Sequence, residues 1–320
     1  MNKISIIGMG ALGILYGSLI AGSCGSECVD YIMDDARYEK YSGRSITVNG
    51  RPMEFRLTRA AEAEPADLLI VAVKANGLQS AIRDMKNAVG ENTIIISVLN
   101  GITSEQLIGD AYGYDNLVYC VAQGMDAAKY GDALNYTVSG ELRIGIPQEV
   151  GEGKDAAGDW EPANPKQAAA LERLEKFIDE AGISYTEEED IVRRLWSKFM
   201  LNVGINQTCM VYGTTFGGAL QEGTEANRTL IAAMREVIAI AQAEGIALSE
   251  ADINQYIEIL GTLSPDGLPS MAQDRMKKQP SEVDSFAGAV IQYADKHGIY
   301  VPENRFLYRQ IKEIEAGYEV

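Results

Sequence analysis

The sequence is poor in histidine and cysteine, and both shortages limit the chemistry that it can support. Its 320 residues include one histidine, His297, which stands just before a glycine in "ADKHGIY". We interpret this histidine as the end of a helix, where a positive charge suits the helix dipole. Cys24, Cys28, Cys120 and Cys209 are too scattered for a disulfide framework, and no second Cys/His pair completes a zinc site. We therefore expect no metal, and a general acid that is lysine, tyrosine or a carboxylate.

Positive charge and long hydrophobic runs are also scarce. Lysine and arginine number 28 against 46 acidic residues, so the net charge of -18 repels nucleic acid and anionic lipid. No run of about 18 apolar residues is present that would span a membrane. The N-terminal apolar run resembles a signal peptide, but its charged region is only Lys3 and glycines interrupt it. We expect no export and no nucleic-acid or membrane partner, and the cytoplasm is the simplest location.

A glycine-rich turn is the clearest motif that is present. In "KISIIGMGALGILYG", residues 4–7 indicate a buried strand and residues 12–20 an apolar helix, with G-x-G-x-x-G between them. In such a strand-turn-helix, the first glycine makes the turn, the second admits a pyrophosphate and the third lets helix and strand pack closely. The sequence therefore predicts a dinucleotide-binding loop formed by Gly8, Met9, Gly10, Ala11, Leu12 and Gly13.

Strand and helix signals alternate in the first half of the chain. "CVDYIM", "DLLIVAVK", "TIIISVLNG" and "LVYCVAQG" indicate short buried strands. "SITVNGRPMEFRL" and "ALNYTVSGELRIGI" indicate two hairpins, and "VGEGKDAAGDWEPANP" indicates an exposed loop. A further short strand is expected near residues 183–186.

Helical patterns dominate the second half, at 166–181, 190–211, 224–244, 249–260, 281–297 and 303–317. Strands that alternate with helices, followed by helices alone, predict an α/β fold with two domains. We expect a Rossmann-type doubly wound N-terminal domain over residues 1–188 and an all-α C-terminal domain over residues 189–320.

Polar residues recur along one otherwise apolar helix. In "LWSKFMLNVGINQT", Lys198, Asn202 and Asn206 follow one another at every fourth position, which places them in one stripe about 40° apart in projection. A polar stripe on a largely buried helix is costly unless it is hydrogen-bonded or faces a water-filled cleft. We favour a cleft, and a satisfied polar seam between helices is the alternative.

Four further polar residues have both a functional and a structural interpretation. Lys74 and Asn100 follow predicted parallel strands, where open α/β sheets bind ligands, although both also suit an ordinary loop. Ser270 could cap a short helix, and Glu282 lies in "SEVD", which resembles a capping box with Ser281 as the N-cap. The local pattern alone leaves both interpretations open.

Together, these segments resemble one protein family, ketopantoate reductase (2-dehydropantoate 2-reductase). The resemblance covers nearly the whole chain in order, and "LWSKFMLNVGIN" with "SMAQD" and "SEVD" is far more specific than the glycine loop. It implies reduction of 2-dehydropantoate to (R)-pantoate by NADPH or NADH, in pantothenate and coenzyme A biosynthesis. The implied partner is a small 2-keto acid, and a homodimer stays open.

The resemblance also assigns roles to individual residues. It implies that Lys198 is the proton donor and that Glu282 is an acidic residue at the site, in contact with substrate or cofactor. The residues implied to bind substrate are Asn100, Asn202, Asn206 and Ser270. The residues implied to contact the cofactor beyond the glycine loop are Lys74, Asn100, Ala128 and Glu282.

Two positions depart from the family pattern. Many relatives have an arginine after the second strand that binds the 2′-phosphate of NADPH, but "YIMDDAR" places Asp34 there, with Arg37 three residues later. A carboxylate accepts hydrogen bonds from a ribose 2′-hydroxyl and repels a 2′-phosphate, which favours NADH. Phe216 stands near a position where some relatives have a polar residue against the substrate, so the identity of the substrate is in doubt. The alternatives are a reductase of another branched 2-keto acid and a non-catalytic dinucleotide-binding sensor.

Overall fold

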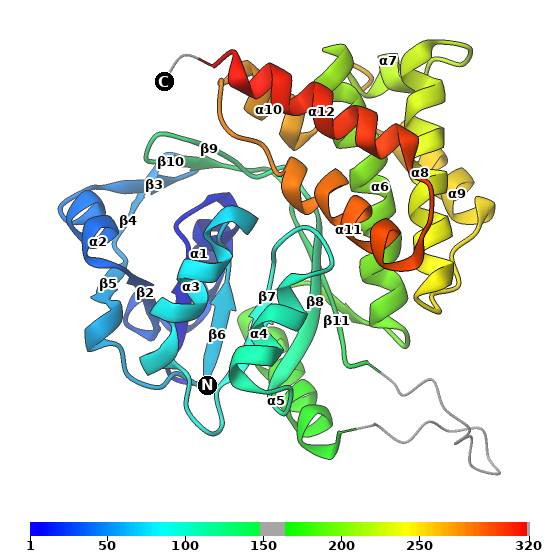
Figure 1. Cartoon of the computed structure of the whole chain (residues 1–320). Helices are drawn as coiled ribbons and strands as arrows, with labels where there is room; N and C mark the ends of the chain where they lie inside the picture. Colours follow the sequence, from blue (N-terminus) through cyan, green and yellow to red (C-terminus); the bar gives the residue numbers. More distant parts are fainter. Residues whose placement is uncertain (148–163, 319–320) are drawn as a thin grey trace. The chain divides into compact units, whose positions relative to one another are not determined.

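The computed structural model describes residues 1–147 and 164–318, and its contacts divide the chain into two compact units (Figure 1). The first unit is Met1–Val192 and the second is Arg193–Val320. The exposed loop predicted in "VGEGKDAAGDWEPANP" lies almost wholly outside the described residues. None of the helices in the described ranges combines the length and the apolar character that crossing a bilayer requires.

An eight-stranded sheet forms the centre of the first unit, in the order β12-β11-β8-β7-β6-β1-β2-β5. Neighbouring strands are parallel, except that β11 runs antiparallel to β8. The predicted buried strands and the short strand near residues 183–186 are therefore confirmed. The strands of this sheet are β1 (Ile4–Ile7), β2 (Val29–Met33), β5 (Arg56–Arg59), β6 (Leu68–Val71), β7 (Ile94–Ser97), β8 (Leu117–Met125), β11 (Ser139–Gly145) and β12 (Tyr185–Glu187).

Helices cover both faces of this sheet, which explains why its strands are apolar on both sides. One buried core joins Ile4 and Ile6 of β1 to residues of α1 and α5, and the other joins Ile7 to residues of α3 and α4. This is the Rossmann-type arrangement that the sequence predicts. The helices of the first unit are α1 (Ala11–Cys24), α2 (Asp35–Tyr41), α3 (Leu78–Asp84), α4 (Ser104–Tyr112) and α5 (Pro165–Ala181).

The order of the strands reverses direction at β1. The chain passes from β1 through α1 to β2 on one side, whereas β6 lies on the other side of β1. The loops that leave the carboxyl ends of the strands diverge at such a point, and open α/β sheets bind their ligands there. The glycine loop, between β1 and α1, lies at this point of the fold.

A second, four-stranded sheet, in the order β4-β3-β10-β9, confirms one predicted hairpin and corrects the other. Strands β3 (Ile46–Val48) and β4 (Arg51–Met53) pair antiparallel around Asn49 and Gly50, which both have positive φ. The second hairpin is wrong, because β10 (Ala133–Asn135) pairs with β9 (Ala128–Tyr130) and β3, whereas β11 joins the large sheet. Asp126 fixes this separation, since its carboxylate accepts hydrogen bonds from the backbone N–H groups of Thr137 and Val138.

The second unit is helical. Five of the six helical patterns predicted for the second half are helices of this unit, and the sixth is α5 of the first unit. Two short helices, α7 and α10, lie between them, and α6 begins two residues before the second unit does. The helices are α6 (Ile191–Tyr212), α7 (Phe216–Leu220), α8 (Glu225–Ala243), α9 (Glu250–Gly261), α10 (Ser270–Met276), α11 (Ala287–His297) and α12 (Pro302–Ala316).

Helix α6 is held by three other helices of this unit. A Cβ at Gly204 would lie 2.6 Å from the Met234 side chain, so glycine lets α8 approach closely. The Gln207 side chain accepts a hydrogen bond from the backbone of Ala287 in α11 and donates one to Asn304 in α12. Gln207 and Asn304 are both fully buried. These contacts fix the position of the helix that carries the predicted polar stripe.

Candidate active site

The glycine loop has the crowding that its motif predicts. Gly8 has a φ of +114°, and a Cβ there would lie 2.5 Å from the carbonyl oxygen of Ala72. A Cβ at Gly13 would lie 1.9 Å from the carbonyl oxygen of Gly8. At Gly10 the nearest atom is 3.6 Å away, an ordinary contact. The fold itself therefore requires the first and third glycines, whereas the space in front of the second is open.

This open space lies at the start of α1. The N-cap residue is Gly10, which has no side chain to accept hydrogen bonds from the first backbone N–H groups of the helix. Unsatisfied N–H groups and the positive end of the helix dipole favour an anion at this position. The residues present therefore fit the pyrophosphate of a dinucleotide.

Three of the predicted site residues lie near this loop because of the strand register. Ile7, at the end of β1, pairs with Val71 at the end of β6, and the neighbouring strands β2 and β7 run in the same direction. Asp34, Lys74 and Asn100 follow β2, β6 and β7 directly or within three residues. The first unit thus brings them to the same edge of the sheet as the glycine loop.

Asp34 has a local structural role in addition to its place at this edge. Its carboxylate accepts a hydrogen bond from the backbone N–H of Arg37 at 2.7 Å and so caps α2, and it forms an ion pair with the Arg37 guanidinium at 2.5 Å. Burial and then the nearby charge of Asp34 raise the pKa of Asp84 at the end of α3. The surroundings of Asp34 therefore contain a second carboxylate, that of Asp84, as well as the Arg37 guanidinium.

Ala128 opens β9, away from the large sheet, and its neighbour Lys129 belongs to a group of cations. Lys40, Arg44 and Lys129 each lie 5.7 to 5.9 Å from the centre of the Tyr41 ring. Burial lowers the pKa of Lys129, and the nearby Lys40 and Arg44 lower it further. This group of cations was not predicted from the sequence.

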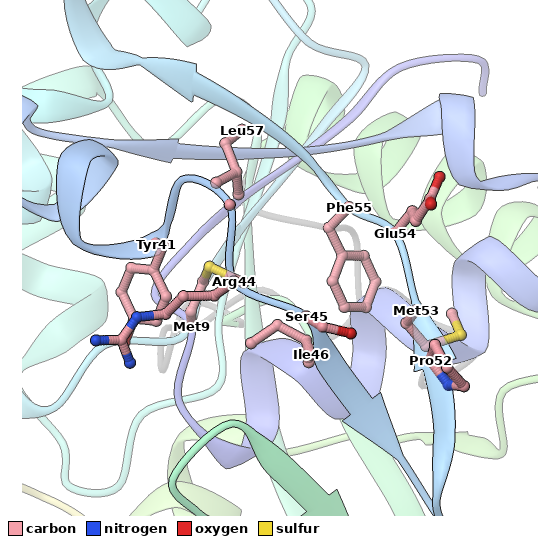
Figure 2. Close-up of a pocket in the computed structure, with 11 residues that line it drawn as sticks. Met9, Tyr41, Arg44, Ser45, Ile46, Pro52, Met53, Glu54, Phe55 and Leu57 are labelled. Atoms are coloured by element: carbon pink, nitrogen blue, oxygen red, sulfur yellow. The ribbon is translucent and has the colours of Figure 1, made fainter.

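A cavity of about 430 Å³ lies beside Tyr41 in the first unit, and Met9 of the glycine loop lines it (Figure 2). Tyr41 and Arg44 lie on one side of it, and Glu54 and Phe55 on the other (Figure 2). Because Met9 belongs to the glycine loop, the cavity lies beside that loop, and Asp34, Lys74 and Asn100 are not among its lining residues. Its lining combines apolar side chains with Arg44, Ser45 and Glu54, and no sequence pattern indicated it.

Helix α6 is largely buried, and the polar residues along it differ in exposure. Phe199, Met200 and Val203 are fully buried or nearly so, whereas Lys198 and Asn202 are partly exposed. Lys198 and Asn202 of the polar stripe therefore reach the surface in part, whereas Asn206 is buried and hydrogen-bonded.

The C-terminal end of the stripe is joined to Ser270 by hydrogen bonds. The Asn206 side-chain oxygen accepts bonds from the Ser270 hydroxyl at 2.9 Å and from the backbone N–H of Met271 at 3.2 Å. The Asn206 amide also donates to the side-chain oxygen of Asn202 at 3.3 Å. Three residues that the resemblance implies for substrate binding thus form one hydrogen-bonded group.

The local capping interpretations are corrected by these contacts. Ser270 is the first residue of α10 and not its cap, because Asn206 of another helix accepts from the α10 N-terminus. Ser281 accepts from the backbone N–H of Val283, but its own N–H donates to Glu315 and not to Asp284, so no complete capping box forms. A 3-10 turn, Val283–Ser285, precedes α11, which therefore begins later than predicted.

Glu282 is partly exposed and lies immediately before this 3-10 turn. Its backbone carbonyl accepts hydrogen bonds from the N–H groups of Ser285 and Phe286, which orders the turn. His297 ends α11 as predicted, with its ring hydrogen-bonded to Glu244. In the described ranges, no three acidic, histidine or cysteine side chains gather so that they could hold a metal ion.

The fold and the glycine loop define a class: a Rossmann-type dinucleotide-binding protein with a helical second unit. The family model described as "Ketopantoate reductase PanE/ApbA" matches residues 4–148, and that described as "Ketopantoate reductase PanE/ApbA C terminal" matches residues 190–315. The chain belongs to the ketopantoate reductase family. It is accordingly an oxidoreductase of the kind that uses a nicotinamide dinucleotide.

Individual relatives agree over almost their whole length. The chain is 26% identical to a 2-dehydropantoate 2-reductase of Streptococcus pyogenes over 319 residues, covering 98% of both chains. A 2-dehydropantoate 2-reductase of Vibrio cholerae is 23% identical over 319 residues, which cover 99% of both chains.

Solved structures share the fold. A ketopantoate reductase from Ralstonia eutropha is 23% identical, with a TM-score of 0.77 and 98% of both chains covered. D-mandelate dehydrogenase with NADH and anilino(oxo)acetate is also 23% identical, with a TM-score of 0.82, covering 99% of this chain and 100% of that one.

Proposed function

We propose that this protein reduces 2-dehydropantoate to (R)-pantoate, in pantothenate and coenzyme A biosynthesis, with Lys198 as the proton donor. The observation that carries the proposal is the hydrogen-bonded group of Asn202, Asn206 and Ser270, which begins one turn of α6 after the partly exposed Lys198. The proposal is supported by family membership, because relatives of similar length are named 2-dehydropantoate 2-reductase.

The chemistry requires an acid and groups that orient an anion. The C2 carbonyl carbon accepts a hydride, which is what a reduced nicotinamide supplies when it is bound, and the carbonyl oxygen takes a proton. An ammonium group such as that of Lys198 stabilises the negative charge that develops on this oxygen and supplies the proton. The Asn202 amide group can donate to the substrate carboxylate, and the Ser270 hydroxyl, whose proton goes to Asn206, can accept from the substrate hydroxyl group. Glu282 and Asn100 are the further proposed contacts.

Steady-state kinetics with a panel of 2-keto acids tests this function. We expect kcat/KM for 2-dehydropantoate to exceed that for 2-ketoisovalerate and phenylglyoxylate by about tenfold or more, because a site with polar ligands penalises a substrate that leaves them unpaired. A higher value for either of the other acids would refute the substrate assignment while keeping the reaction type.

A reductase of another branched 2-keto acid is the second candidate, and Phe216 favours it. The Phe216 backbone N–H donates to the Gly267 carbonyl at 3.0 Å, and a Cβ on Gly267 would lie 2.9 Å from the Phe216 ring. The aromatic ring therefore packs on the loop that leads into Ser270. The structural likeness to D-mandelate dehydrogenase, which acts on a different 2-hydroxy acid, is consistent with this candidate.

For the cofactor we propose NADH over NADPH, on the charges that follow β2. Asp34 and Asp84 lie close enough for one carboxylate to raise the pKa of the other, which disfavours the two negative charges of a 2′-phosphate. Arg37 is already paired with Asp34. Gly8, Gly10 and Gly13 with Met9, Ala11 and Leu12 would hold the pyrophosphate, and Lys74 and Ala128 are the proposed further contacts.

This cofactor proposal predicts that kcat/KM is about tenfold higher with NADH than with NADPH. Replacing Asp34 by serine should lower that ratio, because the charge leaves while a hydroxyl still caps α2. Asp35→Ser, in the first turn of the same helix, is the control and should leave the ratio unchanged. A wild-type preference for NADPH would overturn the cofactor proposal.

A homodimer is the proposed assembly, since a ketopantoate reductase of the same fold from Staphylococcus aureus is dimeric.

A further inference from the structure

Helix α10, which carries Ser270, is attached to α6 at both of its ends. At its start, the Ser270 hydroxyl and the Met271 N–H donate to Asn206 of α6. Near its end, the Arg275 guanidinium donates to the backbone carbonyls of Met210 and Val211, the latter at 3.0 Å. The two helices therefore cap each other, because a side chain of each one satisfies the terminal backbone groups of the other.

The Arg275 contact fits the end of α6 chemically. The last carbonyls of a helix have no partner within it and carry the negative end of the dipole, so a cation there is favourable. Gly213, the residue after α6, has a φ of +60°, and a Cβ there would lie 3.4 Å from the guanidinium nitrogen of Arg275. Glycine therefore leaves the arginine room to reach the end of the helix.

The spacing of the two contacts also agrees on both helices. Asn206 and Val211 are five residues apart, as are Ser270 and Arg275, and five residues of helix rise about 7.5 Å. Helix α10 has only seven residues, and so short a helix is not stable without tertiary contacts. Its position on α6 must therefore come from contacts such as these two.

We propose that Arg275 is a positioning residue for the keto-acid site, which holds α10 on α6 so that the Ser270 hydroxyl stays beside Asn206. This inference rests on the proposed function, in which Ser270 binds the substrate. With Arg275 replaced, α10 loses the hydrogen bonds that join its last turn to the end of α6, and Ser270 is less often in the binding position. The substrate must then order the helix as it binds, which raises KM and leaves the chemical step unchanged.

Kinetics of Arg275→Met with the best keto acid of the panel test the proposal. We expect KM for the keto acid to rise about five- to tenfold, the range of one lost hydrogen bond, while kcat and KM for NADH change less than about twofold. Arg275→Lys, which keeps the charge at the end of α6, should recover part of the loss and guards against a methionine variant that does not fold. Arg228→Met is the matched control, because Arg228 also donates to a backbone carbonyl, that of Gly223, but on the exposed side of α8.

A double-mutant cycle separates positioning from general stability. If Arg275 acts through Ser270, Arg275→Met raises KM in the wild-type protein but has no further effect in Ser270→Ala. The proposal would be overturned if the two substitutions raised KM by independent factors that multiply in the double variant. It would also be overturned if both single variants and the double variant lost kcat equally. Loss of thermal stability alone, with KM unchanged, would overturn it as well.

Amide hydrogen exchange distinguishes this inference from the proposed function. Residues 268–276 should exchange faster in Arg275→Met than in the wild type without any substrate present. If no keto acid of the panel is reduced, the proposed function fails by itself, and unchanged exchange in this segment would then refute the positioning role too.

Discussion

Lys198→Ala is expected to lower kcat for keto-acid reduction by roughly 100-fold or more, the usual effect of losing a general acid. Lys198 is partly exposed, whereas its neighbours Ser197 and Phe199 on α6 are buried. The truncation therefore leaves the buried side of the helix in place. Binding of NADH, measured by fluorescence titration, should be unchanged, because the glycine loop belongs to the other unit. The measurement is steady-state oxidation of NADH at saturating keto acid.

Two further variants make this result specific. Lys198→Arg keeps a cation but donates its proton poorly, so its kcat should stay close to that of the alanine variant. Lys296→Ala, which breaks an ion pair with Glu244 in the last turn of α11, should retain normal turnover. Turnover near the wild-type level in Lys198→Ala would remove the acid from the proposed reaction.

The sequence predicted the parts of the molecule that depend on neighbouring residues. The glycine loop could be recognised because the crowding at Gly13 comes from Gly8 of the same strand-turn-helix, although Gly8 itself is crowded by Ala72 after β6. The buried strands and long helices followed from their hydrophobic periodicity. The second predicted hairpin was wrong because two short strands can alternate correctly and still join different sheets, as β10 and β11 do.

The site in the second unit shows the same limit. The stripe of Lys198, Asn202 and Asn206 was visible from fourfold spacing, but its link to Ser270 joins residues 64 positions apart. Ser270 therefore looked like a local helix cap, whereas its partner comes from α6. No local sequence pattern indicates the role of Arg275, because its hydrogen-bond partners lie at the end of a distant helix.

Gly10→Ala is expected to raise KM and Kd for NADH about tenfold or more while leaving the fold intact. A methyl group at this position would meet only the Ala72 carbonyl oxygen at 3.6 Å, so the protein itself has room for it. The backbone at Gly10, with φ of -78° and ψ of -171°, is extended and open to alanine. The methyl group would, however, occupy the space through which the pyrophosphate must approach the first N–H groups of α1. The test is NADH binding by fluorescence together with thermal unfolding.

Two other glycines of the same segment complete the argument. Gly22→Ala, at an exposed position of α1 with no atom within 4 Å of the new methyl group, should leave NADH binding unchanged and keep or raise stability. Gly13→Ala should instead destabilise the whole unit, because its methyl group would lie 1.9 Å from the Gly8 carbonyl oxygen. If Gly10→Ala binds NADH as the wild type does, the dinucleotide cannot lie against this loop, and the assignment of residues 8–13 fails. If Gly10→Ala loses stability as Gly13→Ala does, the second glycine is needed for the fold and carries no information about the ligand.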